Sequence, residues 1–209
     1  MKRRENGGRR DSLTEEFVSA RDRIVSASID IISDAGLASL TIKNISMRTN
    51  MTESMIYKYC SNTDEILVDV VTTYFKFDGS IFKTIDTRDV SYMDKIYIYV
   101  DAYSSYYNSY YSLSAIMLQY EELLHNTYTR EIVEKGYNFR RECLTKLFEG
   151  ALENKEIEVD YTAEQLADLL LGIFIVCSLN RRVIQRRKTY KEEINIIYDK
   201  WIKTLGYNK

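Results

Sequence analysis

The sequence predicts an all-α protein. Proline is absent from the 209 residues, only 8 residues are glycine, and no segment shows the alternation of a strand bounded by turns. Because proline and glycine interrupt helices, their scarcity allows long uninterrupted ones. Apolar residues also recur at helical spacing along most of the chain. These observations favour a bundle of helices.

The first predicted helix spans residues 13–35. Its apolar positions lie three or four residues apart and are Leu13, Phe17, Ala20, Ile24, Ala27 and Ile31. Gly36 ends this helix. The ten residues at the start of the chain contain five basic side chains and one acidic one, around Gly7 and Gly8. Residues 1–11 are therefore predicted to form a disordered basic arm, because so polar a segment has nothing to pack.

Residues 41–59 are predicted to form two short helices around a tight turn. Ile45, Met51 and Ile56 supply apolar contacts to the preceding helix, and Ser46 and Thr49 are small residues on the inner side. Two helices can approach closely at a corner only where small or apolar side chains face each other. The spacing is thus that of a helix-turn-helix.

The bend of this corner falls at Asn50. Asparagine is a tolerated substitute for glycine at positive φ, because its short amide can bond to the local backbone. Thr41 and Thr52 precede the two helices, and each hydroxyl can cap free backbone N–H groups there. Helix N-termini also attract phosphate, so both hydroxyls are expected near a docked nucleic-acid backbone.

The second short helix, residues 52–59, is the one expected in the major groove of DNA. Tyr57 and Lys58 suit phosphate contacts, whereas Glu53, Ser54 and Met55 are short enough to meet base edges. The predicted DNA-binding residues are Thr41, Lys43, Arg48, Thr52, Glu53, Ser54, Met55, Tyr57, Lys58 and Tyr59. The basic arm either follows into the minor groove or remains a solvated tail. The competing interpretation of the corner is a helical bend in an ordinary all-α core.

Further helices are predicted downstream. The fourth helix begins at Ser61 or Asn62 and runs past Phe75. This helix is shared between the helix-turn-helix head that precedes it and a second domain that follows. The next are expected over residues 92–110, 112–124, 129–153, 162–187 and 191–205. In the helix over 129–153, the predicted apolar stripe is Ile132, Gly136, Phe139, Cys143, Leu147 and Ala151.

Tyrosines are concentrated between Tyr92 and Tyr137. Tyrosine offers a flat apolar face with a polar tip, which suits a cavity for an aromatic or amphipathic effector. The predicted pocket lining is Tyr103, Tyr107, Met117, Tyr120 and Phe174. The alternative is compositional, since a tyrosine-rich chain uses tyrosine wherever a half-buried residue is needed.

Several functional classes receive no support from the sequence. Cys60, Cys143 and Cys177 are odd in number and widely spaced, which indicates neither a disulfide framework nor a metal site and fits a reducing cytoplasm. His125 is the only histidine and is expected to be a polar boundary residue. No nucleophile with a paired base and no phosphate-binding loop is present, so we expect no enzyme, metal or cofactor. The apolar stretch 169–179 is too short to span a membrane.

From Arg23 to Leu67 the chain resembles the TetR family of bacterial transcriptional regulators. The matching residues are Arg23, Ile24, Ala27, Gly36, Leu37, Leu40, Thr41, Ile42, Ile45, Thr52, Ile56, Tyr57, Ser61, Asn62, Asp64, Glu65, Ile66 and Leu67. A looser match comprises Gly150, Glu156, Asp160, Glu164 and Gly172. The family usually has glycine at Asn50 and Ser54, histidine at Tyr59, an aromatic residue at Cys60 and lysine at Thr63. The missing lysine removes one expected phosphate contact.

The resemblance implies that the last two helices pair with those of a second copy. Both carry apolar stripes that are wide for a monomer surface. The predicted interface residues are Leu169, Ile173, Val176, Ile194, Ile197 and Trp201. The predicted organisation is a basic arm (1–11), a three-helix DNA-binding head (12–60), and an effector-binding and dimerisation domain of about six helices (61–209).

The predicted function is a cytoplasmic, homodimeric repressor that a small apolar or aromatic effector releases from a near-palindromic operator on double-stranded DNA. Two alternatives stay open at this point. One is a helical ligand-binding or protein-interaction module whose DNA-reading head has weakened, which the departures from the family pattern favour. The other is an activator of the same family.

Overall fold

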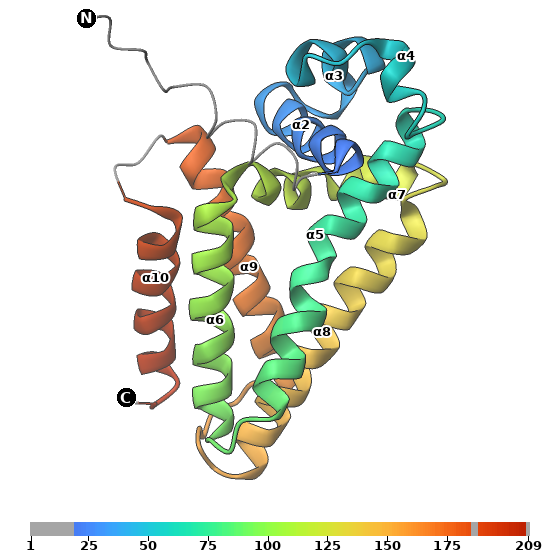
Figure 1. Ribbon diagram of the computed structural model, residues 1–209. Coiled ribbons are helices and arrows are strands. Elements are labelled where there is room, and N and C mark those ends of the chain that lie inside the picture. The colour runs from blue at the N-terminus through green and yellow to red at the C-terminus, as the bar shows by residue number, and fades with distance from the viewer. Residues whose placement is uncertain (1–18, 185–187, 208–209) are drawn as a thin grey trace, which may run out of the picture. The chain divides into compact units, whose positions relative to one another are not determined.

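Helices make up the regular structure of the computed structural model, which describes residues 19–184 and 188–207; no strand occurs within these ranges. The predicted all-α class is confirmed. The basic arm, the start of the first predicted helix and the end of the helix predicted over 162–187 fall partly or wholly outside the described residues. The chain divides into two compact units, residues 1–70 and 71–209. The division falls inside one long helix, α5 (Thr63–Asp86) (Figure 1).

The first unit contains α2 (Ala20–Ala35), η1 (Leu37–Ser39), α3 (Ile42–Thr49), α4 (Glu53–Ile56) and the beginning of α5. Ile24, Ile45, Ile56 and Ile66 are wholly buried and form its core. These residues come from four different helices, so the burial of a small apolar surface holds all four helices together. Gly36 ends α2 at φ 81°, a conformation that glycine adopts without strain.

The bend between α3 and α4 has the predicted conformation. Asn50 adopts φ 56° and ψ 31°, the left-handed region. We expect Asn50→Ala to destabilise the head by about 1 kcal/mol, because a Cβ without a compensating amide is strained at positive φ. Asn50→Gly is the matched control and should leave stability within about 0.5 kcal/mol. Hydrogen exchange of the head's amides reports this local stability; equal protection in both variants would contradict the argument.

The second unit contains the rest of α5 followed by α6 (Tyr92–Ser109), η2 (Tyr111–Gln119), α7 (Tyr120–His125), α8 (Arg130–Glu153), α9 (Ala163–Val183) and α10 (Tyr190–Thr204). Helix α6 packs against both α8 and α10, and α9 packs against the same two helices (Figure 1). The segment predicted as one helix over 112–124 is instead a long 3₁₀ stretch followed by a short α-helix.

Polar caps define where the helices of this unit begin. Thr162 and Thr189 each form a capping box, with Gln165 and Glu192 returning a bond to the capping residue's backbone. The first turn of α6 is capped from a distance, since the Glu156 carboxylate accepts hydrogen bonds from the backbone N–H of Tyr92 and Met93. The capping boxes are local signals, and such signals explain why most helix starts were predictable within a few residues.

The apolar stripe predicted for α8 is confirmed at Leu147 and Ala151, which are buried, and is wrong at Phe139. Phe139 is 44% exposed, whereas the neighbouring Arg140 is 1% exposed and lies in the core. The buried positions of α8 are Val133, Arg140, Leu144, Thr145, Leu147, Phe148, Gly150 and Ala151. Gly136 belongs to the side on which the ring of Phe75 packs, and a Cβ there would collide with that ring. The difference matters because it places a cation inside the second unit.

Two further findings limit what the described residues can do. None of their helices combines the length and the apolar character needed to cross a membrane. No three or more of their His, Cys, Asp and Glu side chains are grouped so as to hold a metal ion. His125 is exposed and lies 3.9 Å from the Glu121 carboxylate. No disulfide joins the three cysteines, which all belong to the described residues, and Cys60 and Cys177 are buried.

Candidate functional site

The corner between α3 and α4 is held by short polar contacts around the bend. The Ser46 hydroxyl donates to the Met51 carbonyl at 2.6 Å, and the buried Thr49 hydroxyl donates to the Ile45 carbonyl at 2.8 Å. Met51 and Ile56 are buried beneath them. The hydroxyls of these small residues therefore supply hydrogen bonds to backbone carbonyls at the corner, and a larger side chain would disturb this arrangement. This arrangement fixes the orientation of α4 within the head.

Both threonines cap the helices that they were predicted to cap. The Thr41 hydroxyl accepts from the Asn44 N–H at 3.1 Å, and the Thr52 hydroxyl accepts from the Met55 N–H at 3.2 Å. Helix α4 has only four residues as an α-helix. A turn continues it, since the N–H groups of Tyr59 and Cys60 both donate to the Ile56 carbonyl. The surface expected over residues 52–59 is thus one helical turn with an extension.

All ten residues predicted to contact DNA are exposed in the first unit. The largest apolar areas among them belong to Met55, Tyr57 and Tyr59, which are 43%, 55% and 42% exposed. Exposed aromatic and thioether groups are costly to leave in water, so their alignment along one short segment favours a binding surface. Arg48 is also exposed, but its guanidinium pairs with the Asp34 carboxylate at 2.6 Å. A phosphate would have to compete with that carboxylate.

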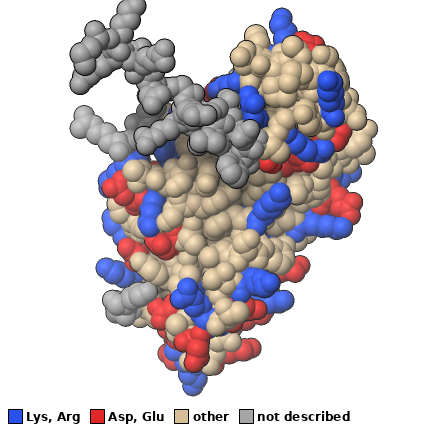
Figure 2. Space-filling view, viewed as in Figure 1, with Lys and Arg blue, Asp and Glu red and all other residues tan. Residues whose placement is uncertain are grey.

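Basic and acidic side chains are interspersed on the visible face of the protein rather than gathered into one field (Figure 2). The chain's formal charge of −2 agrees with this distribution. Lys43 and Lys58 are exposed within the predicted DNA-binding set. Any attraction to a polyanion must therefore come from local groups such as these, because the whole chain supplies no net positive charge.

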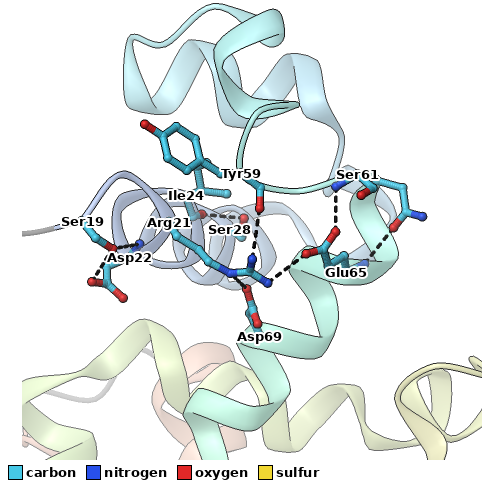
Figure 3. Close-up of polar contacts among 10 residues, drawn as sticks. Ser19, Arg21, Asp22, Ile24, Ser28, Tyr59, Ser61, Glu65 and Asp69 are labelled. Atoms are coloured by element: carbon cyan, nitrogen blue, oxygen red, sulfur yellow. Dashed lines mark hydrogen bonds and ion pairs between the residues drawn. The ribbon is translucent and has the colours of Figure 1, made fainter.

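Arg21 of α2 links the end of the α4 segment to the beginning of α5, as Figure 3 shows. Its guanidinium donates to the Tyr59 carbonyl at 3.1 Å, to the Glu65 carboxylate at 3.0 Å and to the Asp69 carboxylate at 2.6 Å. Nearby, the Arg23 guanidinium donates to the Thr49 carbonyl at 3.1 Å, at the end of α3. Neither arginine role followed from the sequence pattern, although Arg23 directly precedes the buried Ile24 of α2.

The start of α5 is tied to the same network. The Glu65 carboxylate accepts from the Ser61 N–H at 2.7 Å, and the Glu65 N–H donates to the Asn62 side chain at 2.8 Å. The hydrogen bonds from Ser61, and then from Arg21, lower the pKa of Glu65 below its ordinary value. The predicted cap at Ser61 or Asn62 is therefore present as a reciprocal arrangement. It connects α5 rigidly to the residues that follow α4.

The five residues predicted to line an effector pocket lie together in the second unit. Tyr103 stacks on Phe174 with ring centroids 3.9 Å apart, and its centroid is 4.5 Å from that of Tyr107. The Tyr103 hydroxyl donates to the Met117 sulfur at 3.8 Å, and Tyr120 donates to the Tyr74 hydroxyl at 3.2 Å. Their side chains fill the space between them. The predicted cluster is therefore a packed aromatic core in this structure.

A buried ion pair lies at the centre of this aromatic cluster. The Arg140 guanidinium of α8 binds the Asp78 carboxylate of α5 through Nε at 2.9 Å and through Nη2 at 2.7 Å. Both side chains are 1% exposed. Arg140 Nη1 donates to the Tyr74 hydroxyl at 2.9 Å, and the Tyr99 hydroxyl donates to Asp78 at 3.0 Å. The sequence analysis did not identify this pair. The available signal was the position of Arg140, which is seven residues, or about two helical turns, from both Val133 and Leu147 and so shares their face of α8.

Burial raises the pKa of the phenols of Tyr99, Tyr103, Tyr107 and Tyr120 well above the ordinary value. The unfolded chain releases these protons near pH 10, while the folded protein keeps them, so stability must fall as pH rises above about 10. Each such phenol contributes a slope of about 1.4 kcal/mol per pH unit. Absorbance at 295 nm should rise in two steps, the second coinciding with unfolding. Tyr103→Phe should reduce the second step; a single step in a folded protein would contradict this prediction.

The predicted interface residues fall into two groups. Leu169, Ile173, Val176 and Ile197 line an open groove of about 630 Å³ between α9 and α10. Leu169 and Val176 are 43% and 50% exposed. Ile194, by contrast, is fully buried against the core of its own chain, so its predicted role at the surface is wrong. Trp201 is partly exposed and packs near Phe148 and Tyr198.

The outward face of α9 continues beyond this groove. Its large exposed apolar residues are Leu169, Ile175, Val176, Leu179 and Val183, with Ile184 following the helix. The inward face holds Leu166, Leu170, Phe174 and Cys177, all fully buried. Helix α9 is thus apolar on two sides, which a helix at the solvent surface of a monomer does not require.

Solved structures share this fold at low sequence identity. A TetR-family transcriptional regulator from Agrobacterium tumefaciens is 13% identical, with a TM-score of 0.74 over 88% of this chain and 96% of that chain. The fatty acid degradation regulator FadR from Bacillus halodurans is 15% identical, with a TM-score of 0.71 over 86% and 92%. The regulator FadR from Bacillus subtilis, solved in complex with stearoyl-CoA, is 14% identical, with a TM-score of 0.67 over 85% and 95%. No protein-family model and no curated protein sequence matches the chain.

Proposed function

Because this chain has the fold of TetR-family transcriptional regulators, we propose that it is a ligand-responsive, DNA-binding regulator of transcription. The observation that carries the proposal is the exposed segment from Thr52 to Tyr59, presented by a corner with a left-handed residue at its bend. The role is binding rather than catalysis, and its location is the cytoplasm, where the DNA lies.

The α4 segment enters the major groove in this proposal. Ser54 and Met55 contact base edges, and Tyr57 and Lys58 contact phosphates that set the register. The capping hydroxyls of Thr41 and Thr52 lie at helix starts, where a phosphate is also favoured. Exposure of all these side chains and the fixed corner beneath them support the assignment.

The DNA-bound form is a homodimer that reads a near-palindromic operator. We call residues 52–59 the reading segment. A protein with two-fold symmetry places two reading segments on half-sites that lie one helical turn of DNA apart, or a multiple of that distance. The apolar outer face of α9 and the groove beside Ile197 support pairing with a second copy.

We expect Val176→Glu to convert dimer to monomer in sedimentation velocity, while Val90→Glu, at an exposed position elsewhere, leaves the dimer intact. A monomeric wild-type protein would reject the dimer.

Helix α5 transmits the effector signal in this proposal. Arg21 holds Glu65 and Asp69, and Arg140 holds Tyr74 and Asp78, so each arginine binds residues one turn apart on the same helix. The two pairs begin nine residues apart in the sequence of that helix, at Glu65 and at Tyr74. An effector that binds one arrangement of α5 better than another shifts the position of the reading segments by its difference in affinity.

The effector is a small molecule with an apolar or aromatic body, and its binding releases the protein from DNA. The aromatic cluster around Tyr103 supports the first part, and the stearoyl-CoA complex of the Bacillus subtilis regulator is an example of a ligand with an apolar acyl chain on this fold. Release rather than recruitment makes the protein a repressor. Transcription from its own upstream region should rise when the gene is deleted; a fall would favour an activator.

Fluorescence anisotropy with DNA from the gene's upstream region tests the DNA-binding role. Measurements at 50 mM and 200 mM salt separate the sequence-independent electrostatic part from the specific part. The proposal predicts that the upstream DNA binds at least about 10³-fold more tightly than scrambled DNA of equal length. Equal affinity for both DNAs at both salt concentrations would reject a sequence reader and favour the alternative of an interaction module with a weakened head.

A further inference from the structure

The Arg140 guanidinium offers more hydrogen bonds than its neighbours accept. Its recorded bonds use the Nε–H, one N–H of Nη1 and one N–H of Nη2, directed to Asp78 and Tyr74. A guanidinium has five N–H groups. One N–H on Nη1 and one on Nη2 therefore have no acceptor among the described residues. An unmet donor inside a protein costs free energy, so this site is suited to an additional oxygen acceptor.

The surroundings of Arg140 define the shape of that acceptor. The Tyr74, Phe75 and Tyr103 rings lie with their centroids 5.1, 5.5 and 5.4 Å from the guanidinium carbon. Rings at this distance stabilise a cation and present flat apolar faces to whatever joins it. The guanidinium already holds one carboxylate in a two-pronged arrangement, that of Asp78. The same geometry accepts a planar carboxylate from outside the chain.

We propose that Arg140 is the recognition group for the effector, and that the effector is an organic carboxylate with an apolar body. This proposal rests on the proposed function, whose ligand it specifies. The incoming carboxylate accepts from the N–H groups of Nη1 and Nη2 that Asp78 and Tyr74 leave unused, so it shares the guanidinium with Asp78. The apolar body of the effector lies in the space between the Tyr103 and Phe174 rings, which stack on each other in this structure.

Ligand binding at Arg140 acts directly on α5. Asp78 and Tyr74 both belong to α5 and are the two residues of that helix that Arg140 holds. A carboxylate that shares the guanidinium weakens its attraction for Asp78, while Asp78 keeps the hydrogen bond from the Tyr99 hydroxyl. The chemistry that recognises the ligand is therefore the same chemistry that fixes the helix entering the head.

A chemical rescue experiment tests the recognition site. In Asp78→Ala the deleted carboxylate leaves a space beside an unpaired guanidinium, and sodium acetate should fill it. We expect acetate to raise the melting temperature of this variant by 5 °C or more above equal concentrations of sodium chloride. Asp168→Ala is the matched control, since it removes the carboxylate from the more exposed Arg141 pair, and acetate should have no selective effect on it.

The wild-type protein provides the second arm. Sodium 4-phenylbutyrate and sodium octanoate should raise its melting temperature, whereas the corresponding amides at equal concentration should not. The charge-neutral double variant Arg140→Met/Asp78→Leu should lose this preference. Equal shifts with acid and amide, or no shift with either acid, would overturn the proposal, as would a folded Asp78→Ala variant without acetate-selective rescue. These measurements contain no DNA, so their outcome is independent of whether the head reads an operator.

Discussion

Replacing Arg140 by methionine is expected to lower the free energy of unfolding of the second unit by about 3–5 kcal/mol. The substitution leaves the Asp78 carboxylate buried without its cation, and both side chains are 1% exposed in the wild-type protein. An uncompensated buried charge costs far more than the lost packing of one side chain. Thermal unfolding followed by circular dichroism measures the effect, with an expected drop of roughly 10 °C.

The double variant Arg140→Met/Asp78→Leu separates the two contributions to this loss. Apolar side chains of similar volume often stabilise a protein as well as a buried ion pair does. We therefore expect the double variant to recover most of the lost stability while losing the response of DNA binding to effector. A double variant as unstable as Arg140→Met would show that the ion pair is required for folding itself.

The second large effect is expected in the reading segment. Lys58→Ala should weaken binding to the upstream DNA and to scrambled DNA by a similar factor, because a phosphate contact carries no sequence information. The slope of log affinity against log salt concentration should fall by about 0.9 for each lost contact, which is about 1.8 for the dimer. Met55→Ala should instead cost about 1–3 kcal/mol on the upstream DNA alone.

Lys146→Ala is the matched control for this pair of variants. Lys146 is an exposed lysine of α8 in the second unit, so its removal changes the net charge by the same amount without altering the reading segment. It should leave both affinity and salt slope nearly unchanged. An equal loss for Lys58→Ala and Lys146→Ala would mean that binding follows net charge rather than the proposed surface.

The sequence was most informative where short-range chemistry determines the structure. Thr41, Asn50 and Thr52 each act within three or four residues of their own position, through a cap or a backbone conformation. The same holds for the capping boxes at Thr162 and Thr189. Such interactions are encoded locally, so the helix-turn-helix and most helix starts could be predicted from residue types and spacing alone.

The interior of the second unit could not be predicted in the same way. Arg140 and Asp78 are 62 positions apart in the sequence, and a pattern of apolar residues favours Phe139 over its arginine neighbour as a core residue. Only the partner carboxylate and the phenol of Tyr74 make burial of Arg140 possible. The predicted stripe of α8 was wrong at Phe139 because a hydropathy pattern does not show that a distant carboxylate pairs with Arg140.

The predicted interface shows a related limit. A helix that is apolar on two faces gives one wide stripe in the sequence, and nothing in that stripe says which residues turn inward. Leu169 and Val176 are exposed in the structure, whereas Ile194 belongs to the buried side of α10. Likewise, one helix was predicted over residues 112–124, but residues 111–119 form a 3₁₀ stretch packed against α9.

Site-specific photocrosslinking tests the central claim, that the segment following Asn50 contacts base pairs. A benzophenone amino acid placed at Met55 should crosslink to the upstream DNA on irradiation and much less to scrambled DNA. The same probe at Phe139, an equally exposed position of α8, should give no crosslink to either. Crosslinking from position 139 but not from position 55, or from neither position with DNA that is demonstrably bound, would contradict the account.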